Sequence, residues 1–215
     1  ANAFGRKVVR GRGQEGDELV ADALALQEAG VFAIVLEAVP AVGTWAIDPA
    51  HSSFEFVARH LMAKVRGKFS GVSGVATVAE RPQDSTLEVE IDASTVDTGD
   101  QTRDGHLRSN DFFGTEEHPT IAFRSTGVRP GEGENKWLVD GDLTIRGVTR
   151  PVTVDVEFLG GAIDPWGNQR IGFSGAVPEV NREDWGLTWN AALETGGWLL
   201  SKSVRLEIEA ELVKK

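Results

Sequence analysis

Residues 204–212 read VRLEIEAEL, with an apolar side chain at every second position and a charged one between each pair. This period of two places Val204, Leu206 and Ile208 on one face of a β-strand, and Arg205 and the three glutamates on the other. The same alternation recurs over residues 87–92 and 152–158. Several strands that each bury one face predict an antiparallel barrel with an apolar lumen.

The expected fold class is all-β, with one short helix between strands. Residues 100–109 are polar and charged apart from Leu107, a pattern that predicts this helix. Turn signals such as GEG at 131–133 and DPWGN at 164–168 separate the strands. The expected strands cover residues 44–47, 53–59, 64–78, 85–92, 120–128, 136–145, 149–159, 169–177 and 199–213.

The composition excludes several classes of partner. The chain has 22 Lys and Arg against 33 Asp and Glu, a formal charge of −11, which argues against nucleic acid or an anionic membrane surface. No window approaches the run of about 18 apolar residues that a membrane span needs, and residues 1–16 lack the apolar core of a secretory signal. We expect a soluble chain, with the cytoplasm favoured and a periplasmic or secreted location left open.

The first forty residues follow a different pattern from the rest. Asp17 is a suitable N-cap for a helix that runs through Ala29 and stops at Gly30. Residues 31–36 are continuously apolar, as in a strand buried on both faces. We therefore predict a β-α-β-like segment at residues 1–42 and a barrel domain at residues 43–215. Because an isolated unit leaves its strand without neighbours, we expect it to pack against the barrel or to pair with a second chain in a homo-oligomer.

The four histidines are the first candidates for metal or acid-base chemistry. Their spacing matches no HxxH, HxH or HExxH pattern, and the chain has no Cys. His51 and His118 stand beside proline turns, which favours structural roles. His60 ends an alternating strand, and His106 lies in the charged helical stretch, where either could face one end of a barrel. With no nucleophile elbow and no phosphate-binding loop, we expect no catalytic group, metal or cofactor.

Short motifs follow one another in a fixed order from residue 43 onward. They are GTW at 43–45, IDP at 47–49, RH at 59–60, VRGKF at 65–69, DTG at 97–99, DFF at 111–113, LTIRGVTRPV at 143–152, and NR and DWGL within 181–187. Through them the chain resembles the YceI-like family over residues 43–215. The resemblance implies a lipocalin-like, eight-stranded antiparallel barrel. It also implies that the lumen holds a long-chain isoprenoid, either a polyprenyl or a quinone-type lipid.

The alternation and the resemblance together predict a set of ligand-binding residues. Two alternatives stay open. Some inward residues could form packed core and not a cavity wall, and the protein could be an enzyme that acts on an isoprenoid at the end of the barrel near His60 and His106. The expected apolar lining is Phe54, Phe56, Val89, Ile91, Phe123, Val154, Val156, Phe173, Leu206 and Ile208. The expected polar contacts, including those to a polar or pyrophosphate head, are His60, Arg66, Arg103, His106 and Arg124.

A second resemblance covers only residues 6–40. Its motifs are GRG at 11–13, LVADA at 19–23, EAG at 28–30 and FAIVLE at 32–37. They resemble a piece of ketopantoate hydroxymethyltransferase, a β/α-barrel enzyme in which Glu37 would match an active-site glutamate. One β-α-β unit cannot assemble an eight-fold barrel, so no such activity is inferred. The segment suggests a chimera, either a fused or engineered protein, with a natural N-terminal extension as the alternative.

Overall fold

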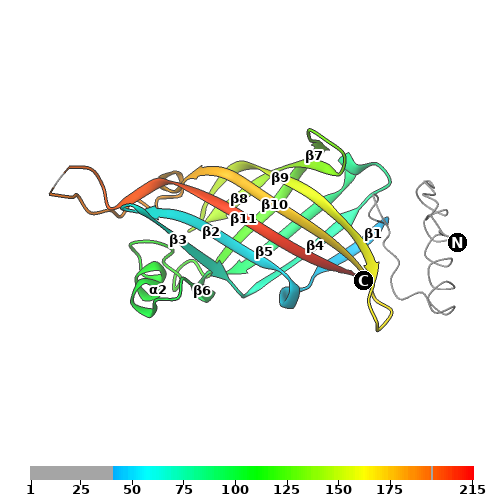
Figure 1. Cartoon of the computed structure of the whole chain (residues 1–215), viewed down its shortest axis with the longest axis horizontal. Helices are drawn as coiled ribbons and strands as arrows, with labels where there is room; N and C mark the ends of the chain where they lie inside the picture. The colour runs from blue at the N-terminus through cyan, green and yellow to red at the C-terminus, as the bar shows by residue number, and fades with distance from the viewer. Residues whose placement is uncertain (1–40, 195) are drawn as a thin grey trace, which may run out of the picture.

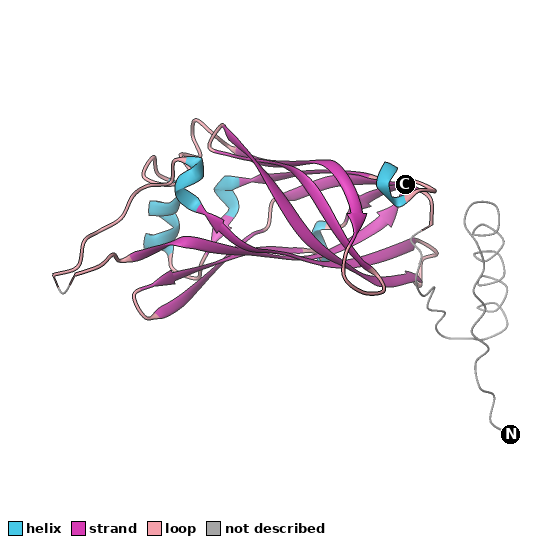
Figure 2. Cartoon of the chain, turned by 90° about the horizontal axis from the view of Figure 1, so that it is seen from above, coloured by secondary structure: helices cyan, strands magenta, loops and turns pink. Residues whose placement is uncertain are grey.

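A computed structural model describes residues 41–194 and 196–215. The predicted N-terminal β-α-β-like segment, with Glu37, lies outside these residues. The described chain forms a closed eight-stranded antiparallel β-barrel with one α-helix, as predicted. Figure 1 shows the strands running obliquely along the long axis, with α2 (Gln101–Arg108) at one end. Figure 2 shows the same strands wrapping around that axis from above.

Three positions in the barrel are each filled by two short strands in line. They are β1 (Gly43–Ile47) with β2 (Ser53–His60), β3 (Ala63–Phe69) with β4 (Val72–Val78), and β5 (Thr86–Asp92) with β6 (Val96–Asp97). The pairing shows this directly, because β2 pairs with β3 while β1 pairs with β4, and β3 pairs with β6 while β4 pairs with β5. The prediction of one continuous strand over residues 64–78 was therefore wrong.

Two of the three breaks between in-line strands have a local cause in hydrogen bonding. Between β1 and β2, the Asp48 carboxylate accepts a hydrogen bond from the Ala50 N–H at 3.0 Å and starts the short 3₁₀ turn Pro49–His51. Between β3 and β4, Gly71 donates its N–H to Thr95 Oγ1 at 3.1 Å and accepts from the Asp92 N–H at 2.7 Å. A Cβ on Gly71 would stand only 2.8 Å from the Thr95 methyl group. The strand bends there because only glycine admits this close contact.

Five longer strands complete the barrel. They are β7 (Thr120–Pro130), β8 (Lys136–Ile145), β9 (Val148–Ile163), β10 (Gln169–Asn181) and β11 (Leu200–Lys214). Each pairs antiparallel with the next, and β5 pairs with β7. β8 and β9 are joined by a two-residue turn in which Arg146 and Gly147 both have positive φ, at 50° and 72°. A turn with positive φ at both residues matches the right-handed twist of the two strands that it connects.

Strand β11 closes the barrel. Along one edge it pairs with β10, and along the other it pairs first with β2, from Leu200 to Glu209, and then with β1, through Leu212 to Lys214. The alternation of residues 204–212 therefore lies where the two ends of the sheet meet. Its apolar phase faces the interior, as the sequence pattern predicted.

Helix α2 is fixed against the barrel by its own polar groups. The Asp100 carboxylate caps its first turn by accepting from the Arg103 N–H at 3.0 Å. Near its end, Arg108 donates from Nε to the Ser94 carbonyl at 2.7 Å and from Nη2 to the Val96 carbonyl at 2.9 Å. These bonds join the helix to the chain just before and within β6. Three further 3₁₀ turns lie at Pro82–Asp84, Ala93–Thr95 and Arg182–Trp185.

Candidate functional site: an apolar cavity in the barrel

The barrel encloses a cavity of about 880 Å³. Its wall reaches from α2 and the segment after β10 at one end to the Pro82–Asp84 turn and the start of β8 at the other. Every strand except the two-residue β6 contributes to the lining. This volume falls in the range of pockets that enclose most of a small-molecule ligand, about 300–1,000 Å³.

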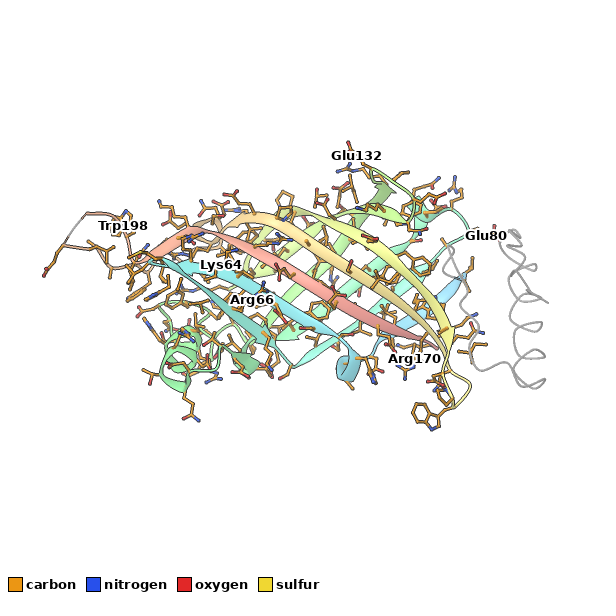
Figure 3. The ribbon with its side chains drawn as sticks, in the orientation of Figure 1. Lys64, Arg66, Glu80, Glu132, Arg170 and Trp198 are labelled. Carbon is orange, nitrogen blue, oxygen red and sulfur yellow. The ribbon has the colours of Figure 1, made fainter. Side chains whose placement is uncertain are left out.

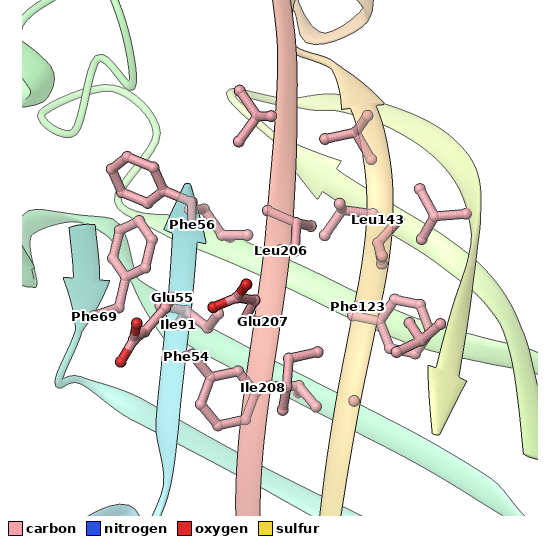
Figure 4. Close-up of a pocket in the computed structure, with 18 of the residues that line it drawn as sticks. Phe54, Glu55, Phe56, Phe69, Ile91, Phe123, Leu143, Leu206, Glu207 and Ile208 are labelled. Atoms are coloured by element: carbon pink, nitrogen blue, oxygen red, sulfur yellow. The ribbon is translucent and has the colours of Figure 1, made fainter. Parts of the chain in front are cut away.

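The inward phase of the strands makes the wall. All ten apolar residues predicted for the lining do line the cavity, and Figure 4 shows six of them as labelled side chains. They are Phe54, Phe56, Val89, Ile91, Phe123, Val154, Val156, Phe173, Leu206 and Ile208. Some also belong to the packed interior, since Phe54, Val89, Phe123 and Val154 are buried while their neighbours along the cavity are only half-buried. Core and cavity wall thus overlap in these four side chains.

Glycines on the inner face shape the space. A Cβ on Gly67 would stand 2.2 Å from the ring of Phe56, and a Cβ on Gly141 would stand 2.4 Å from the ring of Phe123. Each ring occupies the space over the glycine of the neighbouring strand. Gly175 differs, because a Cβ on it would lie 3.4 Å from Val154 Cγ1 and 3.5 Å from Ile208 Cβ, which are ordinary van der Waals distances.

Two of the predicted polar residues do not reach the cavity. Arg66 is 58% exposed on the outer face (Figure 3), where Nη1 lies 2.5 Å from a Glu207 carboxylate oxygen and 3.4 Å from one of Glu55. Arg124 is exposed and pairs in register with Glu88 and Asp142. The outward orientation of both arginines follows from the alternation of their strands, because each is next to an inward-pointing residue. Neither side chain lines the cavity, so their predicted contact with a polar head has no support from the geometry of the lumen.

The other three predicted polar residues line the cavity at its α2 end. They are His60, Arg103 and His106. Arg103 donates from Nε to Thr98 Oγ1 at 2.7 Å and from Nη2 to the Thr98 carbonyl at 2.9 Å. The Thr98 hydroxyl in turn donates to the buried Asp104 carboxylate at 2.6 Å. Arg103 is therefore held by neutral oxygens.

His106 packs against two aromatic rings. Its Nε2 lies 2.9 Å from Asp111 Oδ2, and its ring meets Trp189 and Phe112 edge to face at centroid distances of 4.6 and 5.0 Å. Trp189 comes from the segment after β10, so this contact joins that segment to α2. The end of the cavity near His60 and His106 is thus polar and aromatic, whereas the rest is mainly aliphatic.

Arg182 is a cavity residue that sequence reasoning missed. It begins the 3₁₀ turn after β10, lines the cavity and is only 8% exposed. The available signal was the NREDWGL block at 181–187, which carries part of the family resemblance. Nothing in that pattern shows that this arginine turns inward, because the alternation ends with β10.

An ion-pair network lies at the opposite end of the barrel from α2. Arg170 Nε lies 2.8 Å from Asp164 Oδ2, and Nη1 lies 2.7 Å from Asp48 Oδ2 and 2.5 Å from Glu211 Oε1. The hydrogen bond from Arg170, with a second from His51, lowers the pKa of Asp48 to about 2. Asp48, His51 and Glu211 offer ligand atoms within 4.8 Å of one another, but Arg170 already bonds to both carboxylates, so the cluster is an ion-pair network.

Comparison with known sequences identifies the family. The sequence model described as a YceI-like domain matches residues 45–212. The chain belongs to the YceI-like family. Among its relatives, the UPF0312 protein SA2479 of Staphylococcus aureus (strain N315) is 42% identical over 167 residues, which cover 76% of this chain and 94% of the relative.

Solved structures of YceI-like proteins share the fold. The YceI protein of Campylobacter jejuni is 30% identical, with a TM-score of 0.61 over 73% of this chain and 90% of that one. A polyisoprenoid binding domain from Saccharophagus degradans is 20% identical, with a TM-score of 0.57 over 80% of this chain and 98% of that one. The second likeness shows the fold alone. In the described part of this YceI-like chain, no helix is long and apolar enough to cross a membrane.

Proposed function

We propose that this YceI-like protein binds and carries a long-chain isoprenoid, of the polyprenyl or quinone type, in the lumen of its barrel. The observation that carries the proposal is the cavity of about 880 Å³, lined by the inward phase of ten strands. A cavity of this size with an aliphatic and aromatic wall is complementary to an extended hydrocarbon chain. The name of the Saccharophagus degradans domain, which has the same fold, supports this ligand class.

The energetics favour such a ligand. Each CH₂ group moved from water into the cavity contributes about 0.8 kcal/mol, so several isoprene units offset the cost of ordering a flexible chain. Selectivity among isoprenoids then depends on the length of the cavity and on the polar groups at its α2 end.

The role we propose is non-catalytic. Apart from Glu55 and Glu207, which pair with Arg66 on the outer face, the charged residues of the wall lie at its α2 end. The described hydrogen bonds of His106 and Arg103 reach no serine hydroxyl that could serve as a nucleophile. The rival, an enzyme acting on an isoprenoid at this end, predicts that a bound prenyl compound changes chemically on incubation with the protein.

Mass spectrometry of an organic extract of the purified protein tests the proposal. We expect an isoprenoid at close to one molecule per chain, recovered unaltered after incubation. Protein that neither co-purifies with an apolar ligand nor takes up an added polyprenol or quinone contradicts the proposal. A chemically altered ligand favours the enzyme.

A further inference from the structure

Arg182 is a buried cation in the wall of an apolar cavity. It follows β10 directly, and it is more than nine-tenths buried. The neighbouring segment places it at the α2 end, because Arg182 bonds to Ser201 and Leu187 while Asn190 bonds to Leu200, the partner of His60.

Two of its three nitrogens have acceptors. Nε donates to the Ser201 carbonyl at 3.0 Å, and Nη1 donates to the Leu187 carbonyl. Nη2 is buried and has no acceptor among the described residues. Leaving a buried donor of a charged group unpaired is costly, so such groups are rare and call for an explanation.

Arg182 also forms no ion pair among the described residues, although the nearby charge of Glu183 partly offsets the effect of burial on its pKa. No described carboxylate lies within ion-pair distance of it, and the adjacent Glu183 is paired with Lys202 at 2.8 Å. Burial lowers the pKa of Arg182, but a guanidinium remains charged at neutral pH.

Arg170 shows how the same chain treats another largely buried arginine. At the far end of the barrel, three carboxylates surround that guanidinium. Arg182 has only neutral carbonyl partners, and it stands in the cavity wall, so a group inside the cavity is in a position to supply the missing acceptor.

We infer that Arg182 pairs with an anionic oxygen at the head of the apolar ligand, such as a phosphate or a carboxylate. This inference rests on the proposed function and adds the orientation of the ligand in the cavity. The head lies at the α2 end, with Arg103 and His106 in the same part of the wall, and the hydrocarbon chain extends toward the turn Pro82–Asp84 at the other end.

Three ligands with one chain and different heads test this inference. They are geranylgeranyl diphosphate, geranylgeranoic acid and geranylgeraniol, each titrated into delipidated protein by calorimetry. We expect the wild-type chain to bind both anions at least tenfold more tightly than the alcohol. In Arg182→Met, we expect this preference to disappear while the affinity for the alcohol stays within about twofold, because a neutral head forms no ion pair with residue 182. The change also removes the hydrogen bonds to the Ser201 and Leu187 carbonyls, so circular dichroism checks that the variant is folded.

Arg124→Met is the matched control, since Arg124 is exposed on the outer face, and it should keep the full preference. If Arg182→Met does not fold, Arg182→Lys keeps the charge without the planar fork and should reduce the preference. The preference of the wild-type protein for the two anionic ligands over the alcohol can be measured without any variant. Equal binding of all three ligands by the wild type, or an unchanged preference in Arg182→Met, overturns the inference about the head. Failure of all three to bind overturns the proposed function as well.

Discussion

At the residue scale, Arg170 joins four segments of the barrel through its carboxylate partners. Asp48 precedes the turn between β1 and β2, Asp164 begins the turn after β9, and Glu211 lies on β11. Burial opposes the ionisation of Asp164, but hydrogen bonds from Arg170, from the Asn168 side chain and from two backbone N–H groups outweigh it and lower its pKa. The hydrogen bonds to Asp164, Asp48 and Glu211 in turn raise the pKa of Arg170. This residue fixes the end of the barrel opposite α2.

This network predicts an acid-sensitive contribution to stability. The pKa of Asp48 is 3.8 in an ordinary environment and about 2 in the fold. Because the folded value is the lower one, the stabilisation is complete above about pH 4 and is lost as the pH falls toward 2. In Arg170→Gln, we expect the free energy of unfolding at pH 7 to fall by about 2 kcal/mol, and its decline between pH 4 and 2 to become shallower.

Urea denaturation at pH 7, 4, 3 and 2 measures both effects. Arg129→Gln is the control, because Arg129 forms an exposed ion pair with Asp140 and should change stability less. An Arg170→Gln curve that runs parallel to the wild-type curve between pH 4 and 2 contradicts the assignment of the Asp48 pKa to Arg170.

Gly175 offers a way to fill the cavity from one position. It pairs with Val156 and Ile208, both cavity residues, and a Cβ on it would make only ordinary van der Waals contacts, at 3.4–3.6 Å. In Gly175→Phe, we expect a folded barrel whose bound isoprenoid falls about tenfold or more, because the ring occupies the lumen. Quantitative mass spectrometry of the extract gives the occupancy, and circular dichroism reports the fold.

Gly172→Phe is the matched control on the same strand. Gly172 faces the outer surface, where its nearest neighbour is the exposed Leu159 at 3.7 Å. Its occupancy should equal that of the wild type. If both variants keep their ligand, the lumen is not the binding site.

Alternation explains which side chains could be placed from the sequence. Phe123 and Val65 point inward, so their neighbours Arg124 and Arg66 had to point outward, and a stricter use of the period would have excluded both. Arg182 could not be placed in this way, because it belongs to a 3₁₀ turn and its inward direction depends on bonds to two backbone carbonyls in later segments. The period of two predicts which side chains of a strand point inward, whereas the direction of a side chain in a turn depends on contacts that only the folded structure shows.

At the scale of elements, α2 is a short helix that contains a glycine. Gly105 is exposed, and apart from its chain neighbours and the backbone of the helix itself no atom lies within 4 Å of a Cβ placed on it. Because glycine loses more backbone entropy than alanine in a helix, Gly105→Ala should raise the free energy of unfolding by about 0.5–1 kcal/mol. Chemical denaturation monitored by tryptophan fluorescence measures the change.

Gly99 provides the opposite case just before the helix. Its φ is +77°, which alanine adopts only with strain, so Gly99→Ala should destabilise the protein although it also meets no neighbouring atom. The two variants should therefore change stability in opposite directions. A change in the same direction would contradict a left-handed backbone at Gly99 and a helical backbone at Gly105.

The elements themselves were largely predictable, and the exceptions have local reasons. The alternating strands β9 and β11 were expected at nearly their observed positions. The break between β3 and β4 was missed because apolar residues continue on both sides of Gly71, and only the contact of Gly71 with Thr95 shows the bend. A contact between residues 24 positions apart leaves no local pattern.

At the scale of the whole molecule, the cavity couples binding to stability. A ligand that binds only the folded barrel adds about 2.7 kcal/mol at a concentration of 100 times its Kd. For a domain of this size, that corresponds to a rise in Tm of roughly 5 °C or more. We therefore expect delipidated protein to melt lower than loaded protein, and to recover when a polyprenol is added.

Calorimetric melting of extracted, reloaded and untreated protein provides the measurement. A saturated linear alcohol added at the same concentration separates isoprenoid preference from general hydrophobic binding. Identical melting temperatures for extracted and reloaded protein would contradict occupation of the lumen.

The position of β11 also sets the order in which the barrel is completed during synthesis. This strand pairs with β10 on one edge and with β2 and β1 on the other, and it follows all of them along the chain. Until it leaves the ribosome, β10 and β2 keep free edges and the lumen is open to water along its whole side. Closure is therefore a late step of folding that joins the most distant parts of the barrel, and chaperones that shield strand edges have the longest time to act on β10 and β2.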